Sequence, residues 1–215
     1  VYRSVQFVAQ DMRDETKDMN ADTGRHRTPP RLAVVVPCLN EQEALPHTAS
    51  ELQSVLSSLK ADGLIDAYSF VLYVDDGSTD ATWPIISALS AKSSGEVCGL
   101  RLAANAGHQH AIMAGLRALP DDCDAAVTMD ADLQDSPDEI PELYRMITED
   151  GYDLVSGWKK KRYDPLSKTI PTKLFNATAR KFSGIKNLHD FNCGLKAYKN
   201  CLLYTSPSPR DMRRS

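Results

Sequence analysis

Short runs of β-branched and other apolar residues alternate with helical patterns along most of this chain, and no other feature restricts the fold as strongly. The runs lie at residues 32–36, 69–74, 97–102, 125–129 and 153–156. Strands that alternate with helices in this way predict an α/β domain with a single, mostly parallel, Rossmann-like sheet flanked by helices. A chain of 215 residues is long enough for one such domain.

The segments between these runs carry helical periodicity and helix boundaries. After the first run, apolar residues recur on one helical face before a glycine that can end the helix (Leu45, Leu52, Val55, Leu56, Leu59, Gly63). Ser78 or Thr79 is expected to cap the next helix. Ser136, Pro137 and Glu139 match a capping box at the start of another helix. A further helix is expected at 167–182.

The composition excludes some functions. The formal net charge of −4 argues against a general nucleic-acid-binding protein, which needs a broad basic surface. The five cysteines show no CxxC spacing, so neither a zinc site nor a disulfide framework is expected. No run reaches the roughly 18 apolar residues of a membrane span, which predicts a cytoplasmic chain without its own membrane anchor.

Both ends differ in composition from the middle. Residues 1–30 are polar and charged, and we expect them to form a flexible arm. Residues 201–215 show neither helical nor strand periodicity, and we interpret them as a non-native tail. The folded domain is therefore predicted at 31–200, with an incomplete C-terminus.

Polar residues follow three of the predicted strands at the edge where open α/β sheets bind ligands. After the fourth run, Asp130 and Asp132 stand two apart and can turn their carboxylates toward a common point. Two such oxygen ligands suit Mg²⁺ or Mn²⁺ held jointly with a substrate diphosphate. An acidic turn after a strand is also common, with Asp135 or Ser136 capping the next helix.

The other two polar segments have comparable alternatives. Asp75-Asp76-Gly77 can be a turn that leads into a helix, or one carboxylate can accept hydrogen bonds from a nucleotide base or ribose. Pro37 to Glu41 can be a simple strand exit, with the Glu41 charge favouring a helix start. Each segment alone is a weak signal.

The order and spacing of these segments resemble family 2 glycosyltransferases. The matching stretches are Val35 to Glu41, Val74 to Asp80 and Asp130 to Asp135. Asn105 to Ala111, followed by Ala114-Gly115-Leu116, resembles the subgroup that includes dolichyl-phosphate mannosyltransferases and bactoprenol glucosyltransferases.

This resemblance implies a GT-A fold and a set of site residues. Nucleoside contacts are implied for Pro37, Glu41, Asp75 and Asp76, with Gly107 close to the nucleotide. The metal and diphosphate would face Asp130, Asp132 and Gln134, the cofactor being Mg²⁺ or Mn²⁺. The role of His108 is ambiguous, and it is not included in this set because a lone histidine more often has a structural role.

The resemblance also implies the acceptor. Asp190 to Lys196 is similar to a segment that the subgroup places over the sugar and acceptor, with Asp190 contacting hydroxyl groups, although a loop turning at Gly194 is an alternative. Arg162 and Lys168 belong to a basic stretch that would hold the phosphate of a polyprenyl phosphate acceptor and anionic lipid headgroups, unless it is merely solvated.

These features together predict inverting transfer of a sugar from a nucleotide diphosphate donor to a polyprenyl phosphate. The full-length protein is expected to make peripheral contact with the cytoplasmic face of a membrane. The sequence does not decide whether it forms a homo-oligomer. A transferase for soluble or cell-surface saccharides and a non-catalytic nucleotide-sugar-binding module are the alternatives. A sugar-1-phosphate nucleotidyltransferase would need a glycine-rich loop at Pro37–Glu41, and no GxGxxG supports a nicotinamide enzyme.

Overall fold

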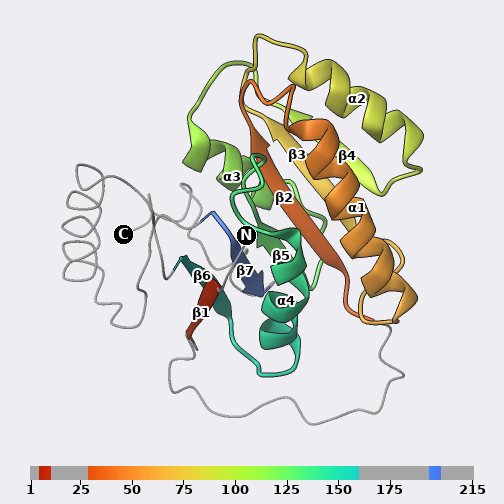
Figure 1. Cartoon of the computed structure of the whole chain (residues 1–215), viewed down its shortest axis with the longest axis vertical. Helices are drawn as coiled ribbons and strands as arrows, with labels where there is room; N and C mark the ends of the chain where they lie inside the picture. The colour runs from red at the N-terminus through yellow and green to blue at the C-terminus, as the bar shows by residue number, and fades with distance from the viewer. Residues whose placement is uncertain (1–4, 11–28, 160–193, 200–215) are drawn as a thin grey trace, which may run out of the picture.

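The computed structural model describes residues 5–10, 29–159 and 194–199 of the chain. In this part, seven strands form one sheet in the order β1-β6-β7-β5-β2-β3-β4 (Figure 1). The strands are β1 (Val5–Gln10), β2 (Leu32–Cys38), β3 (Phe70–Asp75), β4 (Val97–Arg101), β5 (Ala125–Thr128), β6 (Leu154–Lys159) and β7 (Lys196–Lys199).

The four strands β5, β2, β3 and β4 pair in parallel, as the alternating pattern predicted. Strand β2 lies between β5 and β3, and every one of its residues is buried. Val35, for example, is opposite Leu72 on one side and Thr128 on the other. The β-branched run at 32–36 therefore forms a central strand that is covered on both faces.

The other end of the sheet is antiparallel and was not predicted. Strand β7 pairs antiparallel with both β5 and β6, and β1 pairs antiparallel with β6. The expectation that residues 1–30 form a flexible arm is wrong for Val5–Gln10, because the backbone of β1 pairs with the outer side of β6 over six residues. The domain is thus an α/β domain whose single sheet contains both parallel and antiparallel strand pairs.

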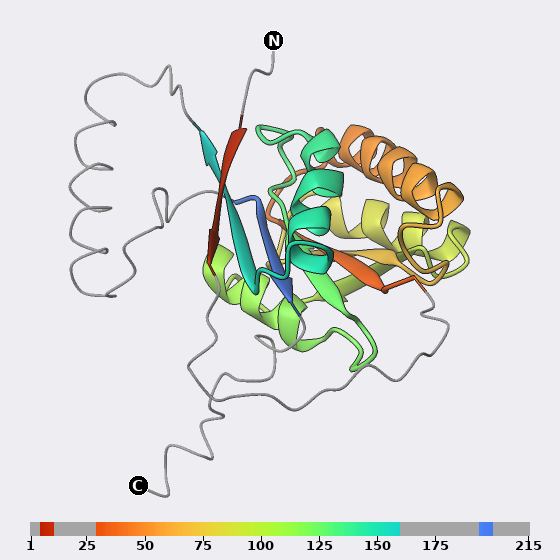
Figure 2. The same cartoon turned by 90° about the horizontal axis from the view of Figure 1, so that it is seen from below.

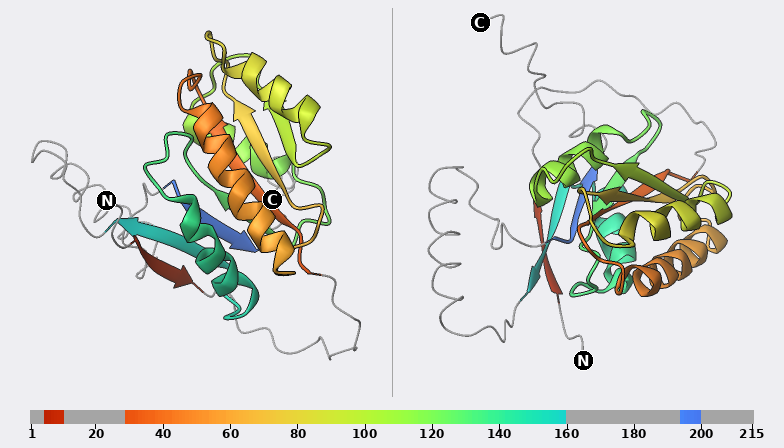
Figure 3. Two further views of the ribbon diagram at one scale, coloured as in Figure 1. Left: turned by 45° about the vertical axis from the view of Figure 1, so that its right-hand side comes forward. Right: turned by 90° about the horizontal axis from the view of Figure 1, so that it is seen from above.

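Helices cover both faces of the sheet. Helices α1 (Leu45–Ala61), α2 (Thr82–Lys92) and α4 (Ile140–Thr148) lie on one face, and α3 (His108–Arg117) lies on the other (Figures 2 and 3). Alternate residues of β2 face the two layers: Val34 and Val36 pack in the core under α1 and α4, whereas Val35 packs in the core under α3.

Two of the predicted helix boundaries are confirmed. Gly63 adopts a φ of 68° just beyond the end of α1, a conformation that glycine takes without steric cost. The Ser136 side chain accepts a hydrogen bond from the Asp138 backbone N–H at 3.3 Å. This bond begins a 3₁₀ turn, Pro137–Glu139, which leads directly into α4.

The predicted cap of α2 is wrong. The N-cap residue is Ala81, and the Asp80 carboxylate accepts the hydrogen bond from the Thr82 N–H at 2.9 Å. The Ser78 hydroxyl instead accepts a hydrogen bond from the Asn40 N–H. Ser78 therefore joins two loops rather than starting the helix.

Some predictions lie outside the described residues. They are the helix at 167–182 and the tail at 201–215, and the domain boundaries near residues 30 and 200 stay predictions. Within the described ranges, no helix combines the length and the apolar composition needed to cross a bilayer.

Candidate active site

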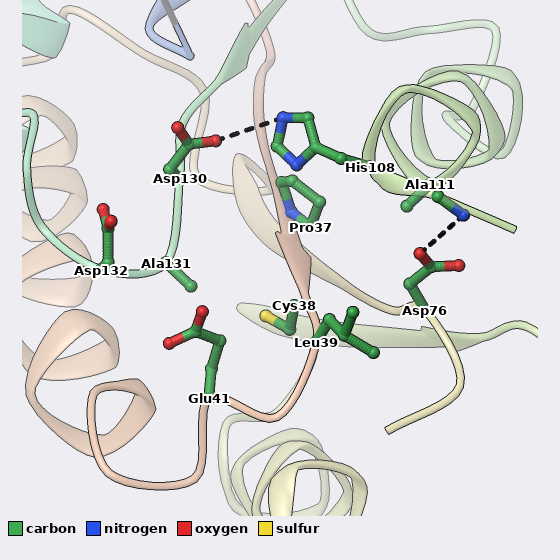
Figure 4. Close-up of a pocket in the computed structure, with 11 residues that line it drawn as sticks. Pro37, Cys38, Leu39, Glu41, Asp76, His108, Ala111, Asp130, Ala131 and Asp132 are labelled. Atoms are coloured by element: carbon green, nitrogen blue, oxygen red, sulfur yellow. Dashed lines mark hydrogen bonds and ion pairs between the residues drawn. The ribbon is translucent and has the colours of Figure 1, made fainter. Parts of the chain in front are cut away.

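The carboxyl ends of β2, β3 and β5 and the amino end of α3 surround an open pocket of about 360 Å³ (Figure 4). This volume lies within the range of about 300–1,000 Å³ found for small-molecule sites. The pocket is lined by Pro37, Cys38, Leu39, Glu41, Asp76, Gly107, His108, Ala111, Asp130, Ala131 and Asp132. Residues from all the strand-end motifs in the sequence therefore meet at one place.

The loop after β2 is joined to the loop after β3 by reciprocal hydrogen bonds. The Asn40 N–H donates to the Ser78 hydroxyl at 2.9 Å, and the Thr79 N–H donates to the Asn40 side-chain oxygen at 2.9 Å. Asn40 has a φ of 56°, a left-handed conformation that asparagine tolerates better than most residues. The conformation of Asn40 directs the following residue, Glu41, into the pocket.

Glu41 carries its carboxyl group at the edge of the pocket among other acids. Its backbone N–H donates to the Thr82 hydroxyl at 2.8 Å, which holds the residue in place. Partial burial raises the pKa of the Glu41 carboxyl above its ordinary value of 4.5, and the charges of Asp132, Asp80 and Asp130 raise it further. Burial is the larger cause of this shift, and the neighbouring carboxylates act in the same direction.

Asp76 is buried and binds the loop that precedes α3. One carboxylate oxygen accepts a hydrogen bond from the Ala106 N–H at 2.8 Å, and the other accepts one from the Gly107 N–H at 2.9 Å. Gly107 has a φ of 95°, which favours glycine, and it is the N-cap of α3. Asp76 thereby sets where α3 begins relative to the pocket.

Asp75 does not line the pocket, although the sequence placed it beside Asp76. It is fully buried, its carboxylate lies 3.2 Å from the Arg101 guanidinium, and it accepts a hydrogen bond from the Ser78 N–H at 3.0 Å. Arg101 also lies over the Trp83 ring at 5.6 Å. Asp75 thus joins the ends of β3 and β4, and its predicted contact with a nucleotide stays a prediction.

The acidic segment after β5 is held against α1. The Thr48 hydroxyl donates a hydrogen bond to the Ala131 carbonyl oxygen at 2.6 Å, and Leu133 takes a φ of 53°. The Asp132 carboxylate accepts a hydrogen bond from the Gln134 N–H at 3.1 Å. Gln134, predicted as a metal ligand, contributes this backbone contact and does not line the pocket.

The residues present fit a divalent cation that is shared with a substrate. Asp130 and Asp132 bring two carboxylates to the same pocket wall, and the carboxyl group of Glu41 lies in the same pocket. In the described ranges, no three His, Cys, Asp or Glu side chains are grouped closely enough to hold a metal ion by themselves. A hard cation would therefore complete its oxygen shell from a diphosphate and water.

His108, whose role the sequence left ambiguous, lies in the pocket. It is the first residue of α3, and its Nε2 atom is 3.5 Å from Oδ1 of Asp130 (Figure 4). Its side chain is half exposed. The sequence signal that could have revealed it is its position directly after Gly107. Gly107 was predicted to lie close to the nucleotide, and the first residue of the following helix lies at the same end of the sheet.

A larger hollow of about 760 Å³ lies at the other end of the sheet, between α1 and α4. Its lining includes Pro30, Leu59, Leu64, Tyr144 and Ile147. It lies at the amino end of β2, whereas ligands of open α/β sheets bind at the carboxyl ends of the strands. We therefore place the active site in the smaller pocket.

The remaining predicted site residues, Asp190, Arg162 and Lys168, lie outside the described residues. The structure thus brings together Pro37, Glu41, Asp76, Gly107, Asp130 and Asp132. Cys38, Leu39 and Ala131 were not singled out, although each lies within a motif, and Ala111 faces the pocket one helical turn after His108.

The mixed sheet with helices on both faces is the GT-A fold, which is found in glycosyltransferases. Two solved structures share the fold. Mannosyltransferase PcManGT from Pyrobaculum calidifontis, solved with GDP-Man and Mn²⁺, aligns with a TM-score of 0.54 at 19% identity, over 81% of this chain and 46% of that chain. S. aureus TarS 1-349 in complex with UDP aligns with a TM-score of 0.50 at 19% identity, over 80% and 48%.

The chain belongs to glycosyl transferase family 2, whose model matches residues 33–204. A relative from Shewanella sediminis, named undecaprenyl-phosphate 4-deoxy-4-formamido-L-arabinose transferase, is 36% identical over 168 residues, which are 78% of this chain and 48% of the relative. The uncharacterized glycosyltransferase YkoT of Bacillus subtilis is 39% identical over 133 residues, 62% of this chain and 39% of YkoT. The chain spans about half the length of the curated relatives it matches, or less.

Proposed function

We propose that this domain binds a nucleotide diphosphate sugar and transfers the sugar to a polyprenyl phosphate at a membrane surface, with inversion at the anomeric carbon. The observation that carries the proposal is that Asp76 and Gly107 share one pocket with Asp130 and Asp132. Nucleoside-side and diphosphate-side residues are thus within reach of one donor. Family membership and the names of the undecaprenyl-phosphate relatives support the acceptor class.

The donor would lie across the carboxyl ends of the parallel strands. Its nucleoside would lie on the side of Pro37 and Asp76. Gly107 has no side chain there, so the backbone permits close approach. Because both Asp76 oxygens already accept backbone hydrogen bonds, Asp76 contributes mainly by fixing this loop. We assign Asp75 a supporting role, since it is fully buried against Arg101.

The diphosphate would lie toward Asp130 and Asp132. When bound there, Mg²⁺ or Mn²⁺ neutralises the negative charge that develops on the departing diphosphate. Asp130 and Asp132 would hold that cation. Without it, their negative charges would repel the diphosphate, because like charges repel at short range. The repulsion makes donor binding depend on the cation.

The acceptor needs no strong general base on the protein. A phosphate monoester has a second pKa of about 6, so it is largely dianionic and nucleophilic at neutral pH. The protein's task is then to align acceptor oxygen, anomeric carbon and leaving diphosphate. Arg162, Lys168 and Asp190 stay the proposed acceptor-side residues, and peripheral contact with anionic lipid would accompany them.

Calorimetry tests the donor site. UDP-glucose and GDP-mannose are titrated into the chain with and without Mn²⁺, beside an Asp132→Ala variant and an Asp62→Ala control at the exposed end of α1. We expect one nucleotide sugar to bind only with Mn²⁺, with binding lost in Asp132→Ala and kept in Asp62→Ala. Equal binding with and without Mn²⁺, or no binding of either donor, would contradict the proposed donor site.

A transfer assay tests the acceptor class. The radiolabelled donor that binds is incubated with the chain and either undecaprenyl phosphate in vesicles or a panel of soluble saccharides. Label in the lipid fraction supports the proposal. Label only in the saccharide fraction would favour a saccharide transferase and contradict the polyprenyl phosphate acceptor.

A further inference from the structure

Gly194 lies two residues before β7 and against the acidic segment, although 64 positions separate it from Asp130. Its carbonyl oxygen accepts a hydrogen bond from the Thr128 hydroxyl at 2.9 Å. The next carbonyl, that of Leu195, accepts one from the Gly157 N–H at 2.9 Å. The backbone at Gly194 is thus attached to β5 on one side and to β6 on the other, and it has little freedom to move away from the sheet.

The space where a side chain of residue 194 would start is filled by the Asp130 carboxylate. A Cβ atom built on Gly194 would lie 2.5 Å from Cγ of Asp130 and 2.7 Å from Oδ1, with Oδ2 closer still. All three nearest atoms belong to this one side chain. Because the backbone is held, any side chain at 194 would force the Asp130 carboxylate to rotate.

The other side of the carboxylate is bordered by His108, whose Nε2 lies 3.5 Å from Oδ1 of Asp130 (Figure 4). Asp130 is therefore confined between the backbone of the segment leading into β7 and the first residue of α3. Rotation away from Gly194 would change both its contact with His108 and the direction in which it faces Asp132.

We propose that Gly194 is a positioning residue, which sets the orientation of the Asp130 carboxylate by leaving no side chain in its place. The consequence for the divalent cation rests on the proposed function. This role differs from a turn that needs glycine, because Gly194 does not have the positive φ of Gly63 or Gly107. The requirement at 194 is one of space.

Cation binding is the first readout. Mn²⁺ affinity in the presence of the nucleotide sugar is measured by electron paramagnetic resonance for the full chain, Gly194→Ala and Gly63→Ala. Gly63→Ala strains a backbone φ of 68° far from the pocket, so it controls for a general loss of stability. We expect Mn²⁺ to bind at least about tenfold more weakly to Gly194→Ala, in line with other residues that orient metal ligands, and unchanged to Gly63→Ala.

A double-mutant cycle on thermal unfolding is the second readout, and it needs no ligand. Gly194→Ala is measured alone and together with Asp130→Ala, which removes the carboxylate that the new methyl group would meet. We expect Gly194→Ala to lower the melting temperature in the wild-type background and to have little effect in the Asp130→Ala background.

The two readouts separate the positioning role from the proposed function. If the wild-type chain binds no Mn²⁺, the donor site is contradicted, while the cycle still tests the contact between Gly194 and Asp130. If Gly194→Ala lowers stability equally in both backgrounds, or prevents folding in both, the added methyl group meets something other than Asp130 and the proposal is overturned. Wild-type Mn²⁺ affinity in Gly194→Ala overturns it as well.

Discussion

The carboxylate of Asp76 accepts a hydrogen bond of 2.9 Å from the backbone N–H of Gly107, 31 residues further along the chain. The contact joins the end of β3 to the start of α3, so that the position of His108 depends on Asp76. The two backbone N–H groups of Ala106 and Gly107 also satisfy the buried Asp76 carboxylate, which would otherwise be costly to bury.

We predict that Asp76→Asn weakens nucleotide binding and lowers stability. An amide can accept one of the two hydrogen bonds, but its NH₂ group then faces the other N–H, which costs about 1–3 kcal/mol in unfolding free energy. Urea unfolding and calorimetry with the nucleotide sugar provide the measurements. Asp62→Asn, the same change at an exposed position, is expected to alter neither, and equal effects of both substitutions would refute the role of Asp76.

At Asn40 the backbone and the side chain can be separated by two substitutions. Asn40→Gly keeps access to the φ of 56° and loses the two hydrogen bonds that the Asn40 side-chain oxygen accepts from the Thr79 N–H and the Thr79 hydroxyl. Asn40→Ala loses both bonds and also strains the left-handed backbone, which adds roughly 1–2 kcal/mol. We therefore expect the unfolding free energy to decrease from the wild type to the glycine variant and again to the alanine variant. An alanine variant as stable as the glycine variant would show that the conformation at residue 40 relaxes freely.

The raised pKa of Glu41 predicts a pH dependence of stability in the metal-free chain. The folded chain holds the Glu41 proton more tightly than the unfolded chain does, so this contribution is present at low pH and is lost as pH rises from about 4.5 through the raised pKa. Glu41→Gln cannot titrate. The melting temperature of Glu41→Gln minus that of the wild type should therefore increase with pH across this window, and Mg²⁺ with donor should reduce the difference. A difference independent of pH would contradict the raised pKa of Glu41.

Gly115 allows α3 to approach the sheet. A Cβ atom there would lie 2.5 Å from Cγ1 of Val35 and 2.8 Å from Cγ2 of Val74. Overpacking of this kind costs about 1–3 kcal/mol, which outweighs or cancels the gain of about 1 kcal/mol in helix propensity. We predict that Gly115→Ala lowers the unfolding free energy by up to about 2 kcal/mol. The loss should shrink in a Val35→Ala background, and a fully additive double variant would argue against the close contact.

The parallel half of the sheet could be predicted because its signals are local. The run at Leu32–Val36 has the β-branched composition of a strand that is buried on both faces, and each following run is separated from the last by a helical pattern. The convergence of Pro37, Asp76 and Asp130 follows from the same topology, since parallel strands end at one edge.

The antiparallel half could not be predicted, because its signals are not local. Strand β7 has the sequence Lys-Ala-Tyr-Lys, which is too short to show a periodic pattern. Its pairing depends on β5 and β6, between which it lies in the sheet. The distinction between Asp75 and Asp76 likewise depends on Arg101, which comes from the neighbouring strand β4. The proximity of Gly194 to Asp130 depends on this same strand insertion.

The position of β7 between β6 and β5 has a consequence for how the polypeptide folds. In the sheet that the structure describes, backbone pairing joins β1 and β6 to the parallel strands through β7, which is made after both of them. During synthesis on a ribosome, β5 must therefore wait with an open edge until residues 196–199 have emerged. Contacts between residues so distant in sequence form slowly, and the unpaired edge is exposed to wrong partners in the meantime.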